Sequence, residues 1–430
     1  MDIIINPSRS QWAALTARNI PADDAAVTAS VEQIVADVAE RGDEALREYA
    51  LKFDGAELSS LRISPDEIED SEQQIAPDVK EAINQAAANI SRFHQAQRPA
   101  PIKVETAPGV ICEQHPVAIN RVGLYIPGGR APLFSTVLML ALPAKIAGCN
   151  EIVLCTPRTG NFPVKAEILY AAKVCGVTEF YQIGGAQAIA AMAYGTETIA
   201  RVDKIFGPGN RFVTKAKQLV STTVAIDMPA GPSEVMVMAD ATARPGFVAA
   251  DLLSQAEHGP DSQAIAVVNS ETLAHNVKAE VERQAALLSR SDSVEGSLSK
   301  SRIIVISDLS DAIDFANLYG AEHLIISTDT PRAVAARIHA AGSIFLGNYS
   351  PESAGDYASG TNHTLPTSGW ARSLSGVNID SFIHKITWQE LTSEGLTALA
   401  PTITAMAQAE GLDAHAEAVN VRLSNLNLKK

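Results

Sequence analysis

The sequence predicts an α/β protein with two doubly wound domains and small helical segments at both ends. Three observations lead to this expectation. The chain has 430 residues, which is more than one ordinary hydrophobic core serves. Short β-rich runs alternate with helical runs in two successive series, 123–206 and 233–346. Ahead of both series, residues 24–96 show helical patterns only.

The N-terminal region shows the spacing of an amphipathic helix. Apolar side chains recur at i, i+3, i+4 and i+7 on one face, at Val31, Ile34, Val35 and Val38. Gly42 is expected to end this helix, and Asp43 is suited to cap the next one.

Each series predicts a parallel sheet flanked by helices. The first has expected strands at 123–126, 151–155, 179–183 and 202–206, with helices at 135–147, 164–175 and 186–194. The second has strands at 235–238, 264–268, 303–306, 324–326 and 343–346, with helices at 245–257, 271–288, 310–318 and 331–340. Two such series indicate two Rossmann-like domains, with a ligand expected in the cleft between them.

The rest of the chain divides around these domains. Residues 349–380 are rich in Ser, Gly, Thr, Asn and Pro and are expected to form a long loop, and 385–427 are expected to be helical. We therefore expect an N-terminal segment at 1–23, a first Rossmann-like domain from 24–129 and 233–373, a second from 130–232, and a C-terminal helical segment at 374–430. The last segment is too small for a core of its own and must dock on another surface.

Composition argues against several classes of protein. A formal net charge of −15 without a Lys/Arg cluster argues against nucleic-acid binding. The N-terminus lacks the pattern of a signal peptide, and the longest apolar run, 137–144, is too short to cross a bilayer. Four cysteines without CxxC spacing are expected to be buried, reduced thiols of a cytoplasmic protein: Cys112, Cys149, Cys155 and Cys175.

Two donor side chains lie near the end of a predicted helix. Gly259 and Pro260 end the helix, so His258 lies in its last turn, with Gln255 three residues earlier on the same face. One nitrogen and one oxygen could thus bind the same ion. The alternative is a His that only stabilises the helix dipole beside a solvated Gln.

An acid and an imidazole are adjacent at Glu322 and His323, between a helix ending at Gly320 and a strand starting at Leu324. Such a pair could divide the work of two general bases. Ligands in open α/β sheets usually bind beyond the carboxyl ends of strands, whereas this pair precedes a strand. An ordinary exposed pair in a turn therefore stays an alternative.

Ligand-type residues also occur in the long loop, at Asp356 and His363, and in the tail, at Glu410 and His415. One amide oxygen, two imidazoles and one carboxylate would make a set suited to zinc with an open position: Gln255, His258, Asp356 and His415. Spacing cannot establish this set, because its members are far apart in the sequence.

Three glycine-rich turns, 126–129, 184–187 and 206–210, each follow a predicted strand and precede a helix. Their N–H groups could face a phosphate. None has the GxGxxG spacing, and tight strand-to-helix turns use glycine in any case, so a dinucleotide site is only one of two interpretations.

Long runs of the chain resemble the histidinol dehydrogenase family. The runs are VGLYIPGG, GGAQAIAA, KIFGPGN, AIDMPAGPSEV, LLSQAEHGPDSQ, YGAEHLII and SPESAGDYASGTNHTLPT. They follow one another in the order found in the family, and the resemblance covers roughly residues 25–425.

The resemblance implies a role for each candidate residue. One zinc per subunit would bind Gln255, His258, Asp356 and His415, and the proton acceptors would be Glu322 and His323. Substrate contacts would be Ser233, Gln255, His258, His323, Asp356, His363, Glu410 and His415. NAD contacts would be Tyr125, Gln187 and Asn210. It also implies a homodimer in which the C-terminal segment docks on the partner subunit and shares its active site.

The reaction implied by the resemblance is the oxidation of L-histidinol to L-histidine with two NAD⁺, through bound L-histidinaldehyde, as the last step of histidine biosynthesis. No cysteine lies in a motif, which favours a hydrate over a thiohemiacetal in the second oxidation. Three alternatives are weighed: a related dehydrogenase acting on another small diol, such as a sulfonated propanediol, a zinc hydrolase, and a metal-binding protein without activity. The contexts of Glu410 and His363 favour a substrate with amino and imidazole groups.

Overall fold

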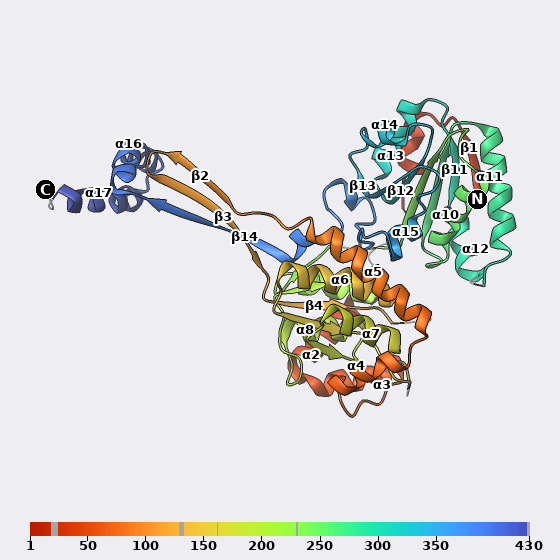
Figure 1. Ribbon diagram of the computed structural model, residues 1–430, viewed down its shortest axis with the longest axis horizontal. Coiled ribbons are helices and arrows are strands. Elements are labelled where there is room, and N and C mark those ends of the chain that lie inside the picture. The colour runs from red at the N-terminus through yellow and green to blue at the C-terminus, as the bar shows by residue number, and fades with distance from the viewer. Residues whose placement is uncertain (19–24, 129–132, 161, 229–230, 290, 428–430) are drawn as a thin grey trace. The chain divides into compact units, whose positions relative to one another are not determined.

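The computed structural model describes residues 1–18, 25–128, 133–160, 162–228, 231–289 and 291–427. The chain folds into two compact units, each with its own internal contacts (Figure 1). The first unit comprises 1–97 and 119–382, and the second comprises 98–118 and 383–430. The first unit contains two parallel sheets, and the second contains one antiparallel sheet.

The smaller parallel sheet of the first unit has five strands in the order β6-β5-β4-β7-β8. Its strands are β4 (Arg121–Tyr125), β5 (Glu151–Cys155), β6 (Glu179–Tyr181), β7 (Lys204–Phe206) and β8 (Ala225–Ile226). The helices that follow them are α6 (Phe134–Ala147), α7 (Ala166–Cys175), α8 (Gly185–Tyr194) and α9 (Arg211–Val220). The strand order reverses between β4 and β7, and this is where α/β sheets usually bind ligands.

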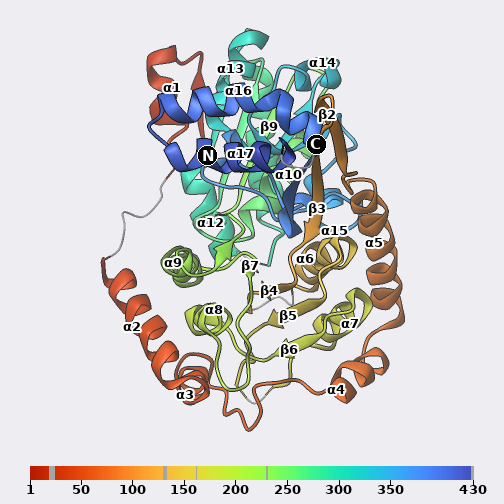
Figure 2. The same cartoon turned by 90° about the vertical axis from the view of Figure 1, so that its left-hand side faces the viewer.

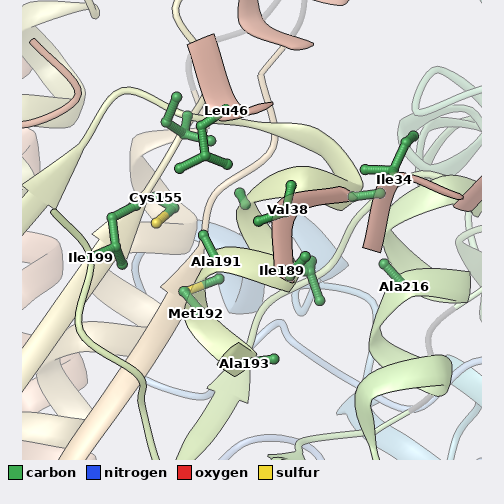
Figure 3. Close-up of a cluster of buried hydrophobic side chains, with 14 of the residues drawn as sticks. Ile34, Val38, Leu46, Cys155, Ile189, Ala191, Met192, Ala193, Ile199 and Ala216 are labelled. Carbon is green, nitrogen blue, oxygen red and sulfur yellow. The ribbon is translucent and has the colours of Figure 1, made fainter. Parts of the chain in front are cut away.

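The N-terminal helices pack on the outer side of the helices that flank this five-stranded sheet (Figure 2). They are α2 (Ala25–Arg41), α3 (Asp43–Asp54), α4 (Pro65–Asp70) and α5 (Pro77–Gln95), with a short 3-10 helix at Ser71–Gln73. The apolar face predicted for α2 is buried: Ile34 and Val38 lie in one cluster with Ile189 and Ala216 (Figure 3). α5 instead contributes Ile83 to the cluster that contains α6 and α7.

The larger sheet of the first unit has six parallel strands in the order β1-β11-β10-β9-β12-β13. Its strands are β1 (Asp2–Ile5), β9 (Glu234–Ala239), β10 (Gln263–Val268), β11 (Arg302–Val305), β12 (Ala321–Ser327) and β13 (Ala341–Leu346). Its helices are α1 (Arg9–Leu15), α10 (Pro245–Ala256), α11 (Glu271–Ala285), α12 (Ser291–Lys300), α13 (Leu309–Tyr319), α14 (Pro331–Ala335) and α15 (Glu352–Tyr357). In the register of β9 and β12, His323 pairs with Val235, so the first residues of the two strands are neighbours.

The second unit is built on an antiparallel sheet in the order β14-β3-β2. Its elements are β2 (Ile102–Ala107), β3 (Val110–Ala118), β14 (Ile383–Leu391), α16 (Ser393–Ala409) and α17 (Asp413–Asn427). Trp388 of β14 stacks on His115 of β3, with their ring centroids 3.9 Å apart. The two helices also pack against each other.

The two doubly wound parallel sheets confirm the predicted fold class. The structure divides the chain differently from the predicted boundaries. Residues 25–97 and β4 belong with the five-stranded sheet, whereas they were expected with 233–373, and β1 pairs with β11 of the other sheet. The predicted helical tail, 374–430, also contains a strand, β14, which pairs antiparallel with β3. No strand was expected in the segment that forms β3.

Two further expectations differ in detail. The predicted loop 349–380 contains α15 and a 3-10 helix at Trp370–Arg372, and a second 3-10 helix, Ile379–Phe382, starts at its end. The four cysteines are unpaired, and three of them are buried, but Cys112 is only half-buried because it lies on β3 of the second unit. No helix in the described part of the chain has the length and apolarity needed to cross a membrane.

Candidate functional site

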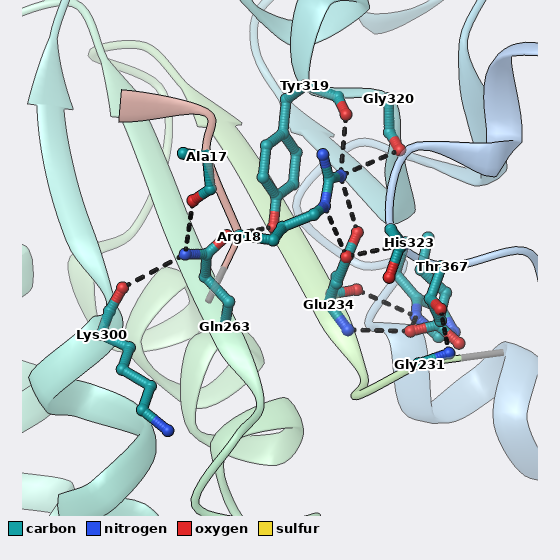
Figure 4. A network of polar contacts seen from close by, with 12 residues as sticks. Ala17, Arg18, Gly231, Glu234, Gln263, Lys300, Tyr319, Gly320, His323 and Thr367 are labelled. Carbon is teal, nitrogen blue, oxygen red and sulfur yellow. Dashed lines mark hydrogen bonds and ion pairs between the residues drawn. The ribbon is translucent and has the colours of Figure 1, made fainter. Parts of the chain in front are cut away.

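The predicted acid–base pair lies at the amino edge of the six-stranded sheet, and both side chains are buried. The backbone of Glu234, on the neighbouring strand β9, contacts both of them (Figure 4). Its N–H donates to Glu322 Oε2 at 2.8 Å, and its carbonyl oxygen lies 3.3 Å from His323 Nδ1. The same carbonyl accepts from Gln255 Nε2 at 3.2 Å. One residue's backbone therefore orients three of the predicted site residues.

The imidazole of His323 is 4% exposed and lies between carboxylates. Its Nδ1 is 2.9 Å from Gln255 Nε2 and 3.7 Å from Glu322 Oε2. Its Nε2 makes no hydrogen bond and lies 3.4 Å from Asp356 Oδ1. Burial lowers the pKa of His323, but the charges of Glu322 and Asp356 outweigh burial and raise this pKa well above its ordinary value. Glu322 and Asp356 thus favour the charged form that the ring takes once it has accepted a proton.

The side chain of Glu234 forms a buried ion pair with Arg18. The guanidinium donates from Nε at 2.6 Å and from Nη2 at 2.8 Å. Arg18 also donates to Tyr319 O at 2.8 Å and stacks 4.0 Å above the Tyr319 ring (Figure 4). The N–H of Ser368 donates to Glu234 Oε1 at 2.8 Å. Burial raises the pKa of Glu234 even so, because desolvation outweighs these partners.

Three of the four predicted zinc ligands belong to the first unit, and two of these three lie beside His323. Gln255 and Asp356 both contact His323. His258 is exposed and lies two residues beyond the end of α10, not in its last turn as predicted. Burial raises the pKa of Asp356, but His323, His363 and His258 together lower it below its ordinary value. Among the described residues, no three His, Cys, Asp or Glu side chains are close enough to hold a metal ion.

These donors still fit zinc. The set contains a carboxylate, an imidazole and an amide oxygen, and zinc accepts all three. His323 Nε2 is buried beside Asp356 and makes no hydrogen bond, so one polar atom at this place lacks a partner. Glu410 and His415 belong to the second unit, where both are exposed, Glu410 at the end of α16 and His415 on α17.

Two other predicted substrate residues lie in the first unit. His363 Nδ1 lies 2.9 Å from the carbonyl oxygen of Asp356, and its Nε2 lies 3.3 Å from Thr136 Oγ1 of α6. Burial lowers the pKa of His363. Ser233 is half-buried just before β9, and its carbonyl accepts from Gln263 N–H at 3.0 Å.

Sequence reasoning missed Glu234, Arg18 and Glu352. Glu352 is 1% exposed and accepts from Ser254 Oγ at 2.6 Å, while its second oxygen has no partner. Burial raises the pKa of Glu352 to about 8. It precedes Asp356 by four residues on α15, and that spacing could have placed both carboxyls on one helix face.

The predicted dinucleotide residues lie at the carboxyl ends of strands in the five-stranded sheet. Tyr125 and Gln187 are buried, and the Tyr125 hydroxyl accepts from Gly185 N–H at 3.1 Å. Asn210 is exposed and caps α9 by accepting from two backbone N–H groups. Gly129 of the first glycine-rich turn lies outside the described residues. These turns follow β4, β6 and β7, so two of them flank the point where the strand order reverses.

Arg18→Met should strongly destabilise the first unit, because it leaves the Glu234 carboxylate buried and unpaired. Loss of one member of a buried pair costs about 3–5 kcal/mol. Denaturant unfolding measures this loss. Arg18→Met combined with Glu234→Gln should recover part of the stability, since no charge is then left unpaired. An Arg18→Met protein as stable as the wild type would show that the pair does not support the site.

Comparisons with known proteins agree in one family. The histidinol dehydrogenase family model matches residues 18–423. Histidinol dehydrogenase of Bacteroides fragilis is 56% identical over 427 residues, with 99% of this chain and 100% of the relative covered. That of Aliivibrio fischeri is 54% identical over 422 residues, covering 97% and 95%. The crystal structure of histidinol dehydrogenase from Elizabethkingia anophelis superposes with a TM-score of 0.96 at 49% identity, covering 99% of each chain. This chain therefore belongs to the histidinol dehydrogenase family.

Proposed function

We propose that this chain oxidises L-histidinol to L-histidine, the last step of histidine biosynthesis, in two successive oxidations that each reduce one NAD⁺. The observation that carries the proposal is the buried Glu322–His323 pair, which the backbone of Glu234 orients beside Gln255 and Asp356. The family match supports the substrate.

In the first oxidation, His323 accepts the proton of the substrate hydroxyl while the carbinol carbon loses a hydride. The unbonded Nε2 of His323 is a candidate acceptor atom. Glu322 and Asp356 lie on either side of the ring and stabilise the positive charge that the proton brings. His363, Ser233 and Glu410 are proposed substrate contacts that hold the imidazole and amino ends.

In the second oxidation, Glu322 accepts a proton from the water that adds to bound L-histidinaldehyde. The resulting hydrate then loses the second hydride. The N–H of Glu234 holds Glu322 Oε2, so the carboxylate keeps one direction through the reaction. A cysteine route is not supported, because burial raises the pKa of Cys149, Cys155 and Cys175, and Cys112 lies on β3 of the second unit.

We assign one zinc per subunit to Gln255, His258, Asp356 and His415. When bound, zinc would position the substrate through its nitrogens and act as a Lewis acid. His415 belongs to the second unit, and we propose that it reaches the site of the partner subunit in a homodimer, together with Glu410. Exchange of one element between protomers is a low-cost route to a dimer.

We assign NAD to the carboxyl edge of the five-stranded sheet, at Tyr125, Gln187 and Asn210. The reversal of strand order between β4 and β7 supports this place. We further propose a cytoplasmic enzyme that does not act on nucleic acid. A related enzyme for another small diol, such as a sulfonated propanediol, is less well supported, because relatives at 52–56% identity are named histidinol dehydrogenase.

Glu322→Gln should separate the two oxidations, because only the second needs an activated water. Loss of a general base typically costs about 100- to 10,000-fold in rate. We expect oxidation of added L-histidinaldehyde to fall by such a factor, while oxidation of histidinol to the aldehyde level survives far better. His323→Asn should slow both steps. Single-turnover assays with each substrate measure the difference, and equal losses at both steps in Glu322→Gln would refute this division of labour.

His258→Asn and His415→Asn should each lower zinc content and activity together, because each removes an imidazole ligand. If the second unit serves the partner subunit, mixed dimers of the two variants contain one intact site. About half of the wild-type activity per dimer should then return. Metal analysis and assays of purified heterodimers measure both effects.

His275→Asn is a matched control, because His275 is exposed on α11 and lies outside the proposed site. It should change neither zinc content nor activity. A verified heterodimer that stays inactive would rule out a shared site, and full activity of zinc-free wild-type enzyme would rule out the metal.

A further inference from the structure

We propose that a buried ion pair, Lys217–Asp227, is a positioning device that holds the turn 207–210 in the shape that NAD binds. The inference rests on the proposed function, which assigns NAD to this edge of the sheet. Lys217 and Asp227 do not touch the dinucleotide in this proposal. They act through the backbone of Gly207, which follows β7 directly.

The pair binds both peptide groups of Gly207. Lys217 lies on α9 and Asp227 follows β8, and their side chains are 5% and 2% exposed. Lys217 Nζ donates to Asp227 Oδ1 and, at 2.8 Å, to the carbonyl oxygen of Gly207. Asp227 Oδ2 accepts from the N–H of Gly207 at 2.8 Å. The three groups thus close a ring of contacts around one glycine.

Gly207 also lies directly against the end of β4. Its φ of +120° is a conformation that side-chain-bearing residues rarely adopt, and a Cβ there would be 2.1 Å from the carbonyl oxygen of Tyr125. Tyr125 in turn accepts a hydrogen bond from Gly185 N–H. The ion pair therefore holds the 207–210 turn beside Tyr125, and through Tyr125 the turn is linked to the turn that bears Gln187.

A buried ion pair is a costly way to gain stability, since apolar side chains of similar size often stabilise a fold as well or better. The pair is well suited to fixing geometry, because Lys217 and Asp227 bond to each other and each also bonds to one of the two peptide groups of Gly207. Asn210 is the N-cap of α9 and lies three residues after Gly207. A change in the backbone conformation of Gly207 would therefore move this proposed NAD contact.

A second ion pair, at the amino ends of the strands in the same sheet, serves as a matched control. Arg121, the first residue of β4, donates two hydrogen bonds of 2.8 Å to Glu179, the first residue of β6. Its side chain is 9% exposed, and that of Glu179 is 20% exposed. This pair is also largely buried, but it lies at the amino ends of the strands, away from the turns assigned to NAD.

The experiment measures the dissociation constant of NADH by calorimetry in zinc-loaded protein, for the wild type, Lys217→Met, Asp227→Asn and Glu179→Gln. Asp227→Asn is the milder change and serves if Lys217→Met does not fold. If the 207–210 turn has its NAD-binding conformation for about a tenth of the time in Lys217→Met or Asp227→Asn, the dissociation constant of NADH rises about tenfold. The KM for histidinol and the zinc content should stay at their wild-type values. Glu179→Gln should lower stability and leave NADH affinity unchanged.

Unchanged NADH affinity in both Lys217→Met and Asp227→Asn would overturn the inference while leaving the proposed function intact. An equal loss of affinity in Glu179→Gln would also overturn it, because weaker binding would then follow from destabilisation in general. A wild-type protein that binds no NADH would contradict the proposed function itself.

Discussion

The backbone of Glu234 is the constraint on which the candidate active site depends. Its N–H and carbonyl group contact Glu322, His323 and Gln255, which come from β12 and α10. The parallel register of β9 and β12 brings these groups together, because it aligns the first residues of both strands. Without the Arg18 partner, the side chain of Glu234 would be an unpaired charge at the same point. The position of the two proposed general bases therefore depends on the packing of the N-terminal residues.

The candidate site residues lie at opposite edges of the two sheets, at the carboxyl ends of the strands in one sheet and at the amino ends in the other. Open α/β sheets commonly bind ligands beyond the carboxyl ends of their strands, and the five-stranded sheet carries the proposed NAD residues at that edge. In the six-stranded sheet, the acid–base pair lies at the amino edge, as the second and third residues of β12. A largely buried ion pair lies at each of these places, Lys217–Asp227 beside the turn after β7 and Arg18–Glu234 beside the acid–base pair.

The helices, the strands and the site residues with motif context could be predicted from the sequence better than the elements and residues that they contact. The spacing of Val31, Ile34 and Val38 identified the buried face of α2, but periodicity does not say which sheet covers a face, so 25–97 were joined to the wrong domain. β14 was missed because strand pairing with β3 is a long-range contact with no local signal. Glu234 was missed because a lone carboxylate before an apolar strand looks like a solvated strand end.

The number of NADH molecules formed per histidinol tests the central claim most directly. The purified, zinc-loaded protein is given limiting L-histidinol and excess NAD⁺, and NADH absorbance and L-histidine are both followed to completion. We expect two NADH for each histidinol consumed and one L-histidine formed, because the proposed roles of His323 in the first oxidation and Glu322 in the second place both steps at one site. A yield of one NADH with L-histidinaldehyde as product, or no NADH at all, would contradict the four-electron oxidation proposed for this chain.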